Sequence, residues 1–409
     1  MRRVAPALLL SAPAMAACLV LSACTGPSTP TSPTPPSASP APTAPPGGQL
    51  MTTALAVESP HPAQLVAGSD GTTHLEYNLV ITNAFTADAT LTELVVRDES
   101  GGELHRLQGD ALRAATFKLL NPEPTVTVPT SAAVEVIVDV PLPAQSGAAP
   151  ATVDNQISYT LPDDAPFRTI IGATTVQARV PVDTSTPAVI KPPLRGPGWL
   201  NFNGCCLSSA PHRTVMLPAD DGAYRAFEMF AIDWVKVSDG TVFRGDGSQL
   251  TDHHAYGSEI YAATAGEVVE VRNDLPNAPV NQSISGNATV KEPRDYPGNH
   301  VTVRFAPDRY AMYAHLQPGS VRVKPGDQVK EGDVLGLLGS SGNASAPHLH
   351  FSIQDGPDAL TSDSLPFVID GYQLTGTANI DPVSLTIDPA TSPQTNTYPL
   401  TYSIVDFGT

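Results

Sequence analysis

The chain has 409 residues, with 22 Lys and Arg against 40 Asp and Glu, and a net charge of −18 at pH 7. Because phosphate groups are bound by clustered Lys and Arg, this balance argues against nucleic acid as a partner and against purely electrostatic capture by anionic lipid. The length allows two folded domains, each able to bury a sizeable core.

The N-terminal segment has the features of an export signal. Arg2 and Arg3 give a positive start, and residues 7–21 are mainly apolar but interrupted by Pro13. This run has the length of a signal h-region and is too short and too broken for a comfortable membrane-spanning helix. We therefore expect residues 1–23 to be a signal peptide.

The end of this segment, Leu21-Ser22-Ala23-Cys24, resembles the lipobox of bacterial lipoproteins. The resemblance implies cleavage before Cys24 and attachment of diacylglycerol to its thiol, which would anchor the protein to the outer face of the cytoplasmic membrane. Two or more acyl chains would make that anchor stable. The alternative is an ordinary signal peptide that happens to contain Cys24.

Residues 24–48 are predicted to be a linker. After the cysteine they consist of Pro, Ser, Thr, Ala and Gly, which offer too little apolar surface to offset the entropy of ordering. The prolines favour an extended, semi-rigid spacer. Such a spacer would hold the folded part of the protein away from the membrane.

Residues 49–188 are predicted to form an antiparallel β-sandwich. Residues 75–82, 133–140 and 175–182 alternate between apolar and polar side chains, and residues 90–97 are rich in Thr and Val. The predicted strands are short, and Gly, Pro, Asn and Asp turns separate them.

This first domain shows no clustering of titratable residues along the sequence. Its histidines, His61, His74 and His105, are scattered. A spacer or binding role therefore fits the domain better than catalysis, although fold alone cannot choose between these roles.

Residues 189–409 are predicted to form the second domain, which begins after a Pro-rich hinge and contains Cys205 and Cys206. Cys18 would leave with the signal peptide and Cys24 would be lipidated, so an adjacent pair remains in an oxidising compartment. A disulfide between neighbours is strained and easily reduced. Free thiols, a mixed disulfide and a thiolate metal ligand are the alternatives.

The most informative motif is His348-Leu349-His350. In an extended strand alternate side chains share a face, so the two histidines project together while Leu349 points into a core. Two imidazoles held that close can divide one task, with one binding a metal and the other acting on what the metal activates. A further histidine, His315, lies upstream in a Tyr-Ala-His-Leu segment.

Around these histidines the chain resembles the LytM/lysostaphin-type zinc endopeptidases, which cut peptide cross-links in bacterial cell walls. The resemblance implies an all-β protein, in which a β-sheet domain of the duplicated-hybrid-motif type follows the sandwich. The order and spacing of seven segments carry it: 256–263, 265–269, 298–301, 313–316, 323–329, 332–336 and 348–351.

The resemblance also implies a zinc site that includes Asp233 and His350 as ligands. The family usually carries His-x-Gly-x-Asp at the first of these positions, but here Met229 replaces the histidine. A thioether is a poor ligand for zinc, and a catalytic zinc normally has three protein ligands and a water. A third ligand must therefore come from elsewhere in the chain.

We consider His212 the first candidate for that ligand. It lies on a predicted strand next to the one that carries the aspartate, and neighbouring strands are about 4.8 Å apart. The alternative for His212 is a hydrogen-bonded surface histidine. His253 and His254 are a second option but are expected in a loop, and Glu228 is expected to point to the opposite side of its strand from the methionine.

By the same resemblance, His315 and His348 are general acid and base residues, and the substrates are peptide bonds of peptidoglycan. Two other hypotheses remain. One is a degenerate domain that binds wall peptides or activates another wall hydrolase without cutting. The other is a carrier module, because residues 323–335 also look like the hairpin of biotinyl or lipoyl barrels, but no attachment lysine turn follows.

Overall fold

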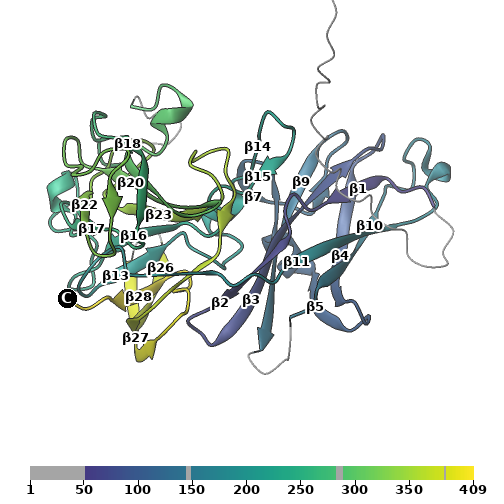
Figure 1. The fold of residues 1–409 in the computed structure, drawn as a ribbon. Helices are drawn as coiled ribbons and strands as arrows, with labels where there is room; N and C mark the ends of the chain where they lie inside the picture. The colour runs from purple at the N-terminus through teal and green to yellow at the C-terminus, as the bar shows by residue number, and fades with distance from the viewer. Residues whose placement is uncertain (1–50, 144–148, 282–288, 382–383) are drawn as a thin grey trace, which may run out of the picture. The chain divides into compact units, whose positions relative to one another are not determined.

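The computed structural model describes residues 51–143, 149–281, 289–381 and 384–409 (Figure 1). The expected signal peptide, Cys24 and the linker lie outside the described residues. Regular structure in the described part is almost entirely β, with a single short α-helix, α1 (Gly109–Ala114), so the all-β prediction is confirmed. No helix in these residues is long and apolar enough to cross a membrane.

The N-terminal half forms a sheet with the strand order β5-β4-β10-β11-β2-β3-β9-β6-β7, in which β1 also pairs with β3 and β8 with β4. All four segments predicted as strands fall inside observed strands. Among the described strands of this sheet, pairing is antiparallel except between β11 and β2, which run parallel. The strand bounds are β1 (Leu55–Glu58), β2 (Ala63–Ala67), β3 (Thr72–Asn83), β4 (Ala89–Asp98), β5 (Glu103–Gln108), β6 (Thr116–Lys118), β7 (Asn121–Pro124), β8 (Thr127–Val128), β9 (Ala133–Pro143), β10 (Thr152–Thr160) and β11 (Thr175–Asp183).

One face of this curled sheet encloses an apolar core. Alternate residues of its long strands meet there in one fully buried cluster, for example Leu75 and Tyr77 of β3, Leu94 of β4 and Val138 of β9. The period of two that predicted these strands thus also selects the residues of the core.

The opposite face of β3 is buried too, which alternation did not predict. His74, Glu76 and Asn78 share that face with Glu135 of the paired strand β9, and all four are less than 9% exposed. The prediction of scattered titratable groups is therefore wrong. Part of the second half of the chain covers this face, since the 3-10 turn η2 (Pro211–Thr214) contacts β9.

The second half forms another large sheet, with the strand order β21-β18-β19-β20-β23-β16-β13-β28-β26-β27 and β24 paired to β23. The strand pairs β12–β25, β14–β15 and β17–β22 form three separate two-stranded sheets. The domain boundary at residues 188 and 189 stays a prediction. The bounds are β12 (Ala188–Ile190), β13 (Trp199–Phe202), β14 (Leu217–Pro218), β15 (Tyr224–Arg225), β16 (Ile232–Lys236), β17 (Glu259–Tyr261), β18 (Gly266–Arg272), β19 (Asn299–Ala306), β20 (Arg309–Leu316), β21 (Gln328–Val329), β22 (Val334–Leu337), β23 (Leu349–Gln354), β24 (Ser364–Leu365), β25 (Phe367–Ile369), β26 (Tyr372–Asp381), β27 (Ser384–Gln394) and β28 (Ser403–Asp406).

Strand β23 is the central element of this sheet. It pairs with β20 on one side and β16 on the other, and all six of its residues are buried. The ring of Phe351 lies 5.2 Å from that of Tyr313 and 5.3 Å from that of Phe367 between centroids. A strand held by both neighbours and by such packing gives the side chains at its start a fixed position.

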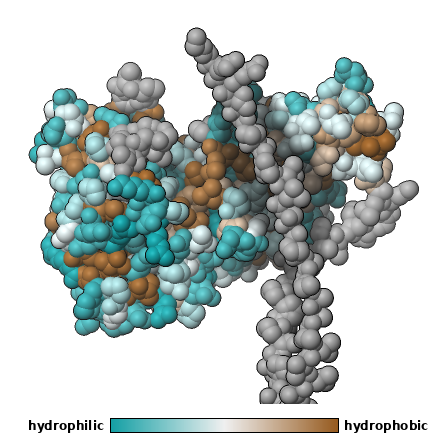
Figure 2. Space-filling model, turned by 90° about the horizontal axis from the view of Figure 1, so that it is seen from above, coloured by the Kyte–Doolittle hydropathy of each residue, from teal (hydrophilic) through white to brown (hydrophobic). Residues whose placement is uncertain are grey.

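In the view of Figure 2, hydrophobic residues form groups at several places among the hydrophilic ones. The large hydrophobic side chains that are exposed in the described residues come from both halves of the chain. Single exposed residues of this kind are normal on protein surfaces. They are Met51, Leu120, Phe167, Ile170, Val189, Leu207 and Phe243.

Candidate metal centre and catalytic site

Strand pairing places Asp233 and His350 opposite each other. They are register partners on the neighbouring strands β16 and β23, and Nδ1 of His350 lies 3.0 Å from Oδ1 of Asp233. His348, two residues earlier, places its Nε2 3.3 Å from the same oxygen. The His-x-His pair therefore projects to one side, towards a single buried carboxylate.

His212 reaches this carboxylate from outside the sheet. It lies on η2, not on the strand that the sequence predicted, and its Nε2 lies 3.2 Å from Oδ2 of Asp233. Its Nδ1 lies 3.0 Å from the carbonyl oxygen of Ala231. Because a carbonyl only accepts hydrogen bonds, Nδ1 carries a proton, and Nε2 of the neutral ring keeps its lone pair for a ligand.

These residues fit a bound metal ion. One ligand atom from each of His212, Asp233 and His350 lies within 4.8 Å of the others, and each histidine has a nitrogen 3.0 or 3.2 Å from one of the two carboxylate oxygens of Asp233. Ligands about 2.0–2.2 Å from a tetrahedral ion lie about 3.3 Å apart. Two imidazoles and a carboxylate also form a common three-ligand set of catalytic metal sites, which leave a fourth position for water.

Met229, which replaces the family histidine, is not part of this group. It is 2% exposed and packs in the hydrophobic core of the second half. His212, with its Nε2 3.2 Å from Asp233, is the histidine that the structure brings to the group instead.

His315 and His348 flank the metal group. Their ring centroids are 4.6 Å apart, and His315 lies 5.8 Å from His350. Nδ1 of His315 lies 2.8 Å from the carbonyl oxygen of Ser341, and Nδ1 of His348 lies 2.8 Å from that of Ala346. Both rings therefore present Nε2 to the site when they are neutral.

The backbone at His315 supports a functional role. Its φ angle is 66°, in the left-handed region that L-residues other than glycine seldom adopt. Such a conformation costs about 1–3 kcal/mol and persists where the surroundings impose it, often at active sites.

Burial and neighbouring charges separate the protonation states of these two histidines. Burial, together with the charges of His348 and His350, holds the pKa of His315 well below its ordinary value. For His348 burial acts in the same direction, but the carboxylate of Asp233 outweighs it and raises the pKa. The two pKa values are thus shifted in opposite directions, as in sites where the surroundings divide the roles of base and acid between two groups.

The metal group has its own charge balance. Burial opposes ionisation of Asp233, yet His212 and His348 hold its pKa well below the ordinary value. Burial also disfavours the His212 cation, but Asp233 and Glu228 together raise the pKa of His212 to about 9. In the metal-free protein His212 is therefore protonated at neutral pH.

Glu228 is a site residue that sequence reasoning placed wrongly. Its side chain is buried, its Oε2 lies 3.9 Å from Nε2 of His212, and Tyr296 donates a hydrogen bond of 2.9 Å to its Oε1. The expectation that it points away assumed strand alternation. However, residues 227–230 form a turn, and β16 begins only at Ile232.

Asn203 is a second residue that sequence reasoning missed. It follows β13 with a φ of 69°, and its Nδ2 donates a hydrogen bond of 2.8 Å to Oδ2 of Asp233. An asparagine is well suited to this left-handed position, but nothing in its sequence context distinguishes it from other turn residues.

The other candidate residues lie apart from the site. His253 and His254 make loop contacts, with the carbonyl oxygen of Gly247 and the hydroxyl of Thr241. Cys205 and Cys206 are bonded to each other in the structure and contribute no ligand to the group of His212, Asp233 and His350.

One small cavity adjoins the site in the part of the chain that the structure describes. A cavity of about 10 Å³ adjoins His315 and His350, which is close to the room that one water molecule needs. Its other lining residues include Glu228, Tyr296, Pro297 and Met312. A water can be held next to the metal group, but a peptide substrate requires these walls to move.

Comparison with known proteins gives a family for part of the chain. Residues 249–362 match the sequence model of peptidase family M23. This range contains His315, His348 and His350, whereas His212 and Asp233 lie upstream of it.

Three curated relatives match short parts of the chain. Endolysin 2638A of Staphylococcus phage 2638A is 40% identical over 73 residues, which are 17% of this chain and 15% of that protein. Cell division protein DipM of Caulobacter vibrioides is 30% identical over 118 residues, 29% of this chain and 16% of that protein. Peptidoglycan DD-endopeptidase ShyC of Vibrio cholerae is 36% identical over 78 residues, 18% of each. The chain thus spans less than a fifth of the length of these relatives.

Among solved structures, the catalytic domain of the antimicrobial peptidase lysostaphin from Staphylococcus simulans is similar to this chain. It has 20% sequence identity and a TM-score of 0.21, and the match covers 36% of this chain and 80% of that one. On the match of residues 249–362 and the similarity to peptidoglycan endopeptidases, this chain carries a peptidase family M23 domain.

Proposed function

We propose that this protein is a zinc metalloendopeptidase that hydrolyses peptide bonds in peptidoglycan. The observation that carries the proposal is the convergence of His212, Asp233 and His350 on one point, with His315 and His348 beside it. The M23 domain and the peptidoglycan endopeptidases among its relatives support the substrate class.

The ligand set favours zinc, which accepts imidazole and carboxylate ligands in tetrahedral sites. His212 would bind through Nε2, His350 through Nδ1 and Asp233 through a carboxylate oxygen. When bound, zinc supplies a Lewis acid and a water whose pKa is lowered to about 7.

The two flanking histidines would then move the protons. His315, neutral with its Nε2 free, accepts a proton from the attacking water. His348, whose pKa the carboxylate of Asp233 raises from 3.3 Å away, would donate a proton through Nε2 to the oxygen or nitrogen on which negative charge develops. Asn203 would keep the carboxylate of Asp233 oriented by donating a 2.8 Å hydrogen bond to its Oδ2.

The small cavity favours a second candidate function, a domain that binds wall peptides or activates another hydrolase without cutting. The side chains of His212, Asp233, His348 and His350 are 7–12% exposed, and the adjoining space is about 10 Å³. A centre that stays closed in this way would bind zinc without reaching a substrate.

We further propose that the protein works in the cell envelope, lipid-anchored through Cys24 on the outer face of the cytoplasmic membrane. The lipobox-like sequence before Cys24 supports this location.

Replacing His212 with alanine is expected to remove stoichiometric zinc. The purified chain should retain about one zinc ion after dialysis, and His212→Ala should retain little, because two protein ligands are too few. Metal content by atomic emission measures this. The matched control is His254→Ala, a loop histidine that should leave zinc bound. Full zinc in His212→Ala would show that another residue supplies the third ligand.

His315→Ala separates the two candidate functions. If the chain is an enzyme, the variant should keep its zinc but lose about 10²- to 10⁴-fold in the rate of peptidoglycan hydrolysis, because the general base is gone. Release of soluble fragments from purified peptidoglycan measures the rate. A wild-type chain that holds zinc but releases no fragments would instead support the non-cutting function.

Zinc binding at pH 7 should release about one proton from His212. Its pKa of about 9 in the metal-free protein means that the proton is present at neutral pH, and a ligating imidazole must lose it. The release should diminish as the pH rises through 9. Titration calorimetry in two buffers with different ionisation enthalpies measures it, and equal binding enthalpies in both would contradict the expected release.

Cys24→Ala is expected to move the protein from the membrane fraction to the soluble fraction of the cell envelope or to the medium, because the acylated thiol is lost. Fractionation followed by immunoblotting measures the shift. Membrane association that is equal in Cys24→Ala and in the wild type would rule out the lipid anchor at this residue.

A further inference from the structure

Two consecutive residues of η2 face in different directions. His212 points to Asp233 in the metal group, with 3.2 Å between Nε2 and Oδ2. The next residue, Arg213, points to the N-terminal sheet, where its guanidinium lies 2.6 Å from Oε2 of Glu76. Both side chains of this ion pair are 0% exposed. One short turn therefore joins a proposed metal ligand to a buried charge pair.

The N-terminal sheet supplies this partner from the unexpectedly buried face of β3. Glu76 stands opposite Asp139 of β9, and Asn78 of the same face donates a 3.1 Å hydrogen bond to Glu135. Burial raises the pKa of Glu135 to about 7, with Asn78 and Arg213 opposing the shift.

Separating Arg213 from Glu76 would be energetically unfavourable, because both groups are buried. A guanidinium does not lose its proton in proteins, and a buried charge without a counter-charge is strongly unfavourable. Burial raises the pKa of Glu76 well above its ordinary value, and the guanidinium of Arg213 opposes that shift. The 2.6 Å contact with a guanidinium that is itself fully buried favours the ionised carboxylate, so we treat the two groups as an ion pair. Removal of that carboxylate charge would leave a buried cation unpaired.

We propose that Arg213 is a positioning residue for the metal centre, and that its ion pair with Glu76 fixes η2 so that His212 meets Asp233. The N-terminal domain then has a defined task, since it completes the geometry of a site whose other ligands lie on β16 and β23. This inference rests on the proposed zinc site and adds to it a dependence on the first domain.

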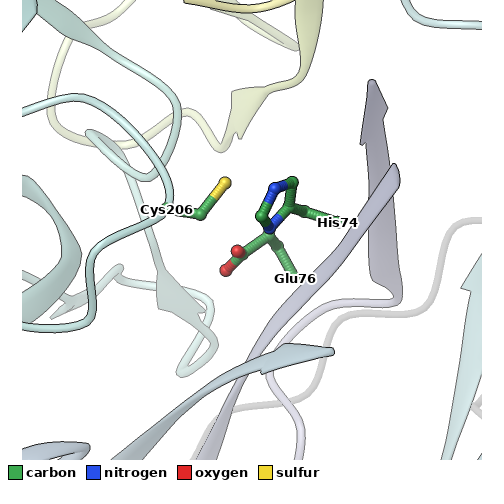
Figure 3. Close-up of side chains that lie close together, drawn as sticks. All are labelled: His74, Glu76 and Cys206. Carbon is green, nitrogen blue, oxygen red and sulfur yellow. The ribbon is translucent and has the colours of Figure 1, made fainter. Parts of the chain in front are cut away.

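A second metal site is an alternative interpretation of this region, where Figure 3 shows three possible ligand side chains. The side chains of His74, Glu76 and Cys206 lie close together, with their ligand atoms within 4.8 Å. However, the sulfur of Cys206 is bonded to Cys205 and is no thiolate, and thiolate is the form in which cysteine binds metals. The guanidinium of Arg213 beside Glu76 would also repel a metal cation.

His74 has partners of its own in this cluster. Its Nδ1 lies 2.9 Å from Oδ1 of Asp139, and its Nε2 lies 3.4 Å from Oδ2 of Asp70. Although burial acts against it, these carboxylates raise the pKa of His74. An imidazole with a carboxylate close to each ring nitrogen is part of a polar network and is not a free metal ligand.

The test compares two isosteric variants of the full-length protein, Glu76→Gln and Glu135→Gln. Both remove a carboxylate from the same buried face, but only the first removes the partner of Arg213. Zinc affinity can be measured by competition with a chromophoric chelator. We expect it to fall about tenfold in Glu76→Gln, which is the lower limit of the loss usually seen when a contact that supports a metal ligand is removed. It should stay unchanged in Glu135→Gln. Cobalt-substituted Glu76→Gln should also show an altered visible spectrum.

A merely structural role gives a different result. In that case the unfolding midpoint of metal-free Glu76→Gln would fall while its zinc affinity and cobalt spectrum stayed wild-type, which would overturn the proposal. If Glu76→Gln does not fold, Arg213→Lys answers the same question, because it keeps the charge but loses the fork of the guanidinium. Unchanged zinc affinity in Arg213→Lys would likewise count against positioning by this ion pair.

The proposed function can fail separately. A wild-type chain that binds no zinc would refute the metal site itself. A wild-type chain that binds zinc as tightly as its Glu76→Gln variant does would refute only the positioning role. A second zinc equivalent, lost in Glu76→Gln but not in His212→Ala, would favour the metal site at His74, Glu76 and Cys206 instead.

Discussion

The candidate site is organised around one buried carboxylate. Asp233 is 8% exposed, and burying an isolated ionised carboxylate would be strongly unfavourable. Three imidazoles compensate, with nitrogen atoms 3.0, 3.2 and 3.3 Å from its oxygens. Every other group of the site takes its position or its protonation state from this arrangement.

The sheet makes that arrangement reproducible. Strand β23 lies in the middle of the second sheet and pairs with a strand on each side. The pairing register places His350 of β23 opposite Asp233 of β16 and opposite Ala314 of β20. The ligand from η2 has no such ladder of hydrogen bonds. A 3-10 turn of four residues has little stability of its own, and its contacts with Ala231 and Glu76 are therefore the means by which it is held.

On our proposal, the N-terminal domain helps to position the metal centre through Glu76. Its sequence alone does not suggest this role. Its strands carry a polar face that is buried, with an ion pair, a histidine of raised pKa and a carboxyl of raised pKa. Buried ion pairs contribute little net stability compared with apolar packing. Their value here, on our proposal, is that they specify one position of η2.

The sequence by itself determined the strands and the central motif. A period of two identified β3, β9 and β11, and the same period placed His348 and His350 on one side, because both consequences follow from local backbone geometry. The resemblance to the wall endopeptidases pointed to Asp233 and His315 as site residues and to Met229 at the position where the family usually has a histidine.

Only the tertiary structure brought a histidine from elsewhere in the chain to Asp233. His212 lies 21 residues before Asp233 in the sequence and on a turn, and strand alternation placed Glu228 on the wrong side because residues 227–230 are not extended. Nothing local connects Arg213 to Glu76. These contacts join segments far apart in the chain, and burial between two sheets, which no short-range pattern encodes, brings them together.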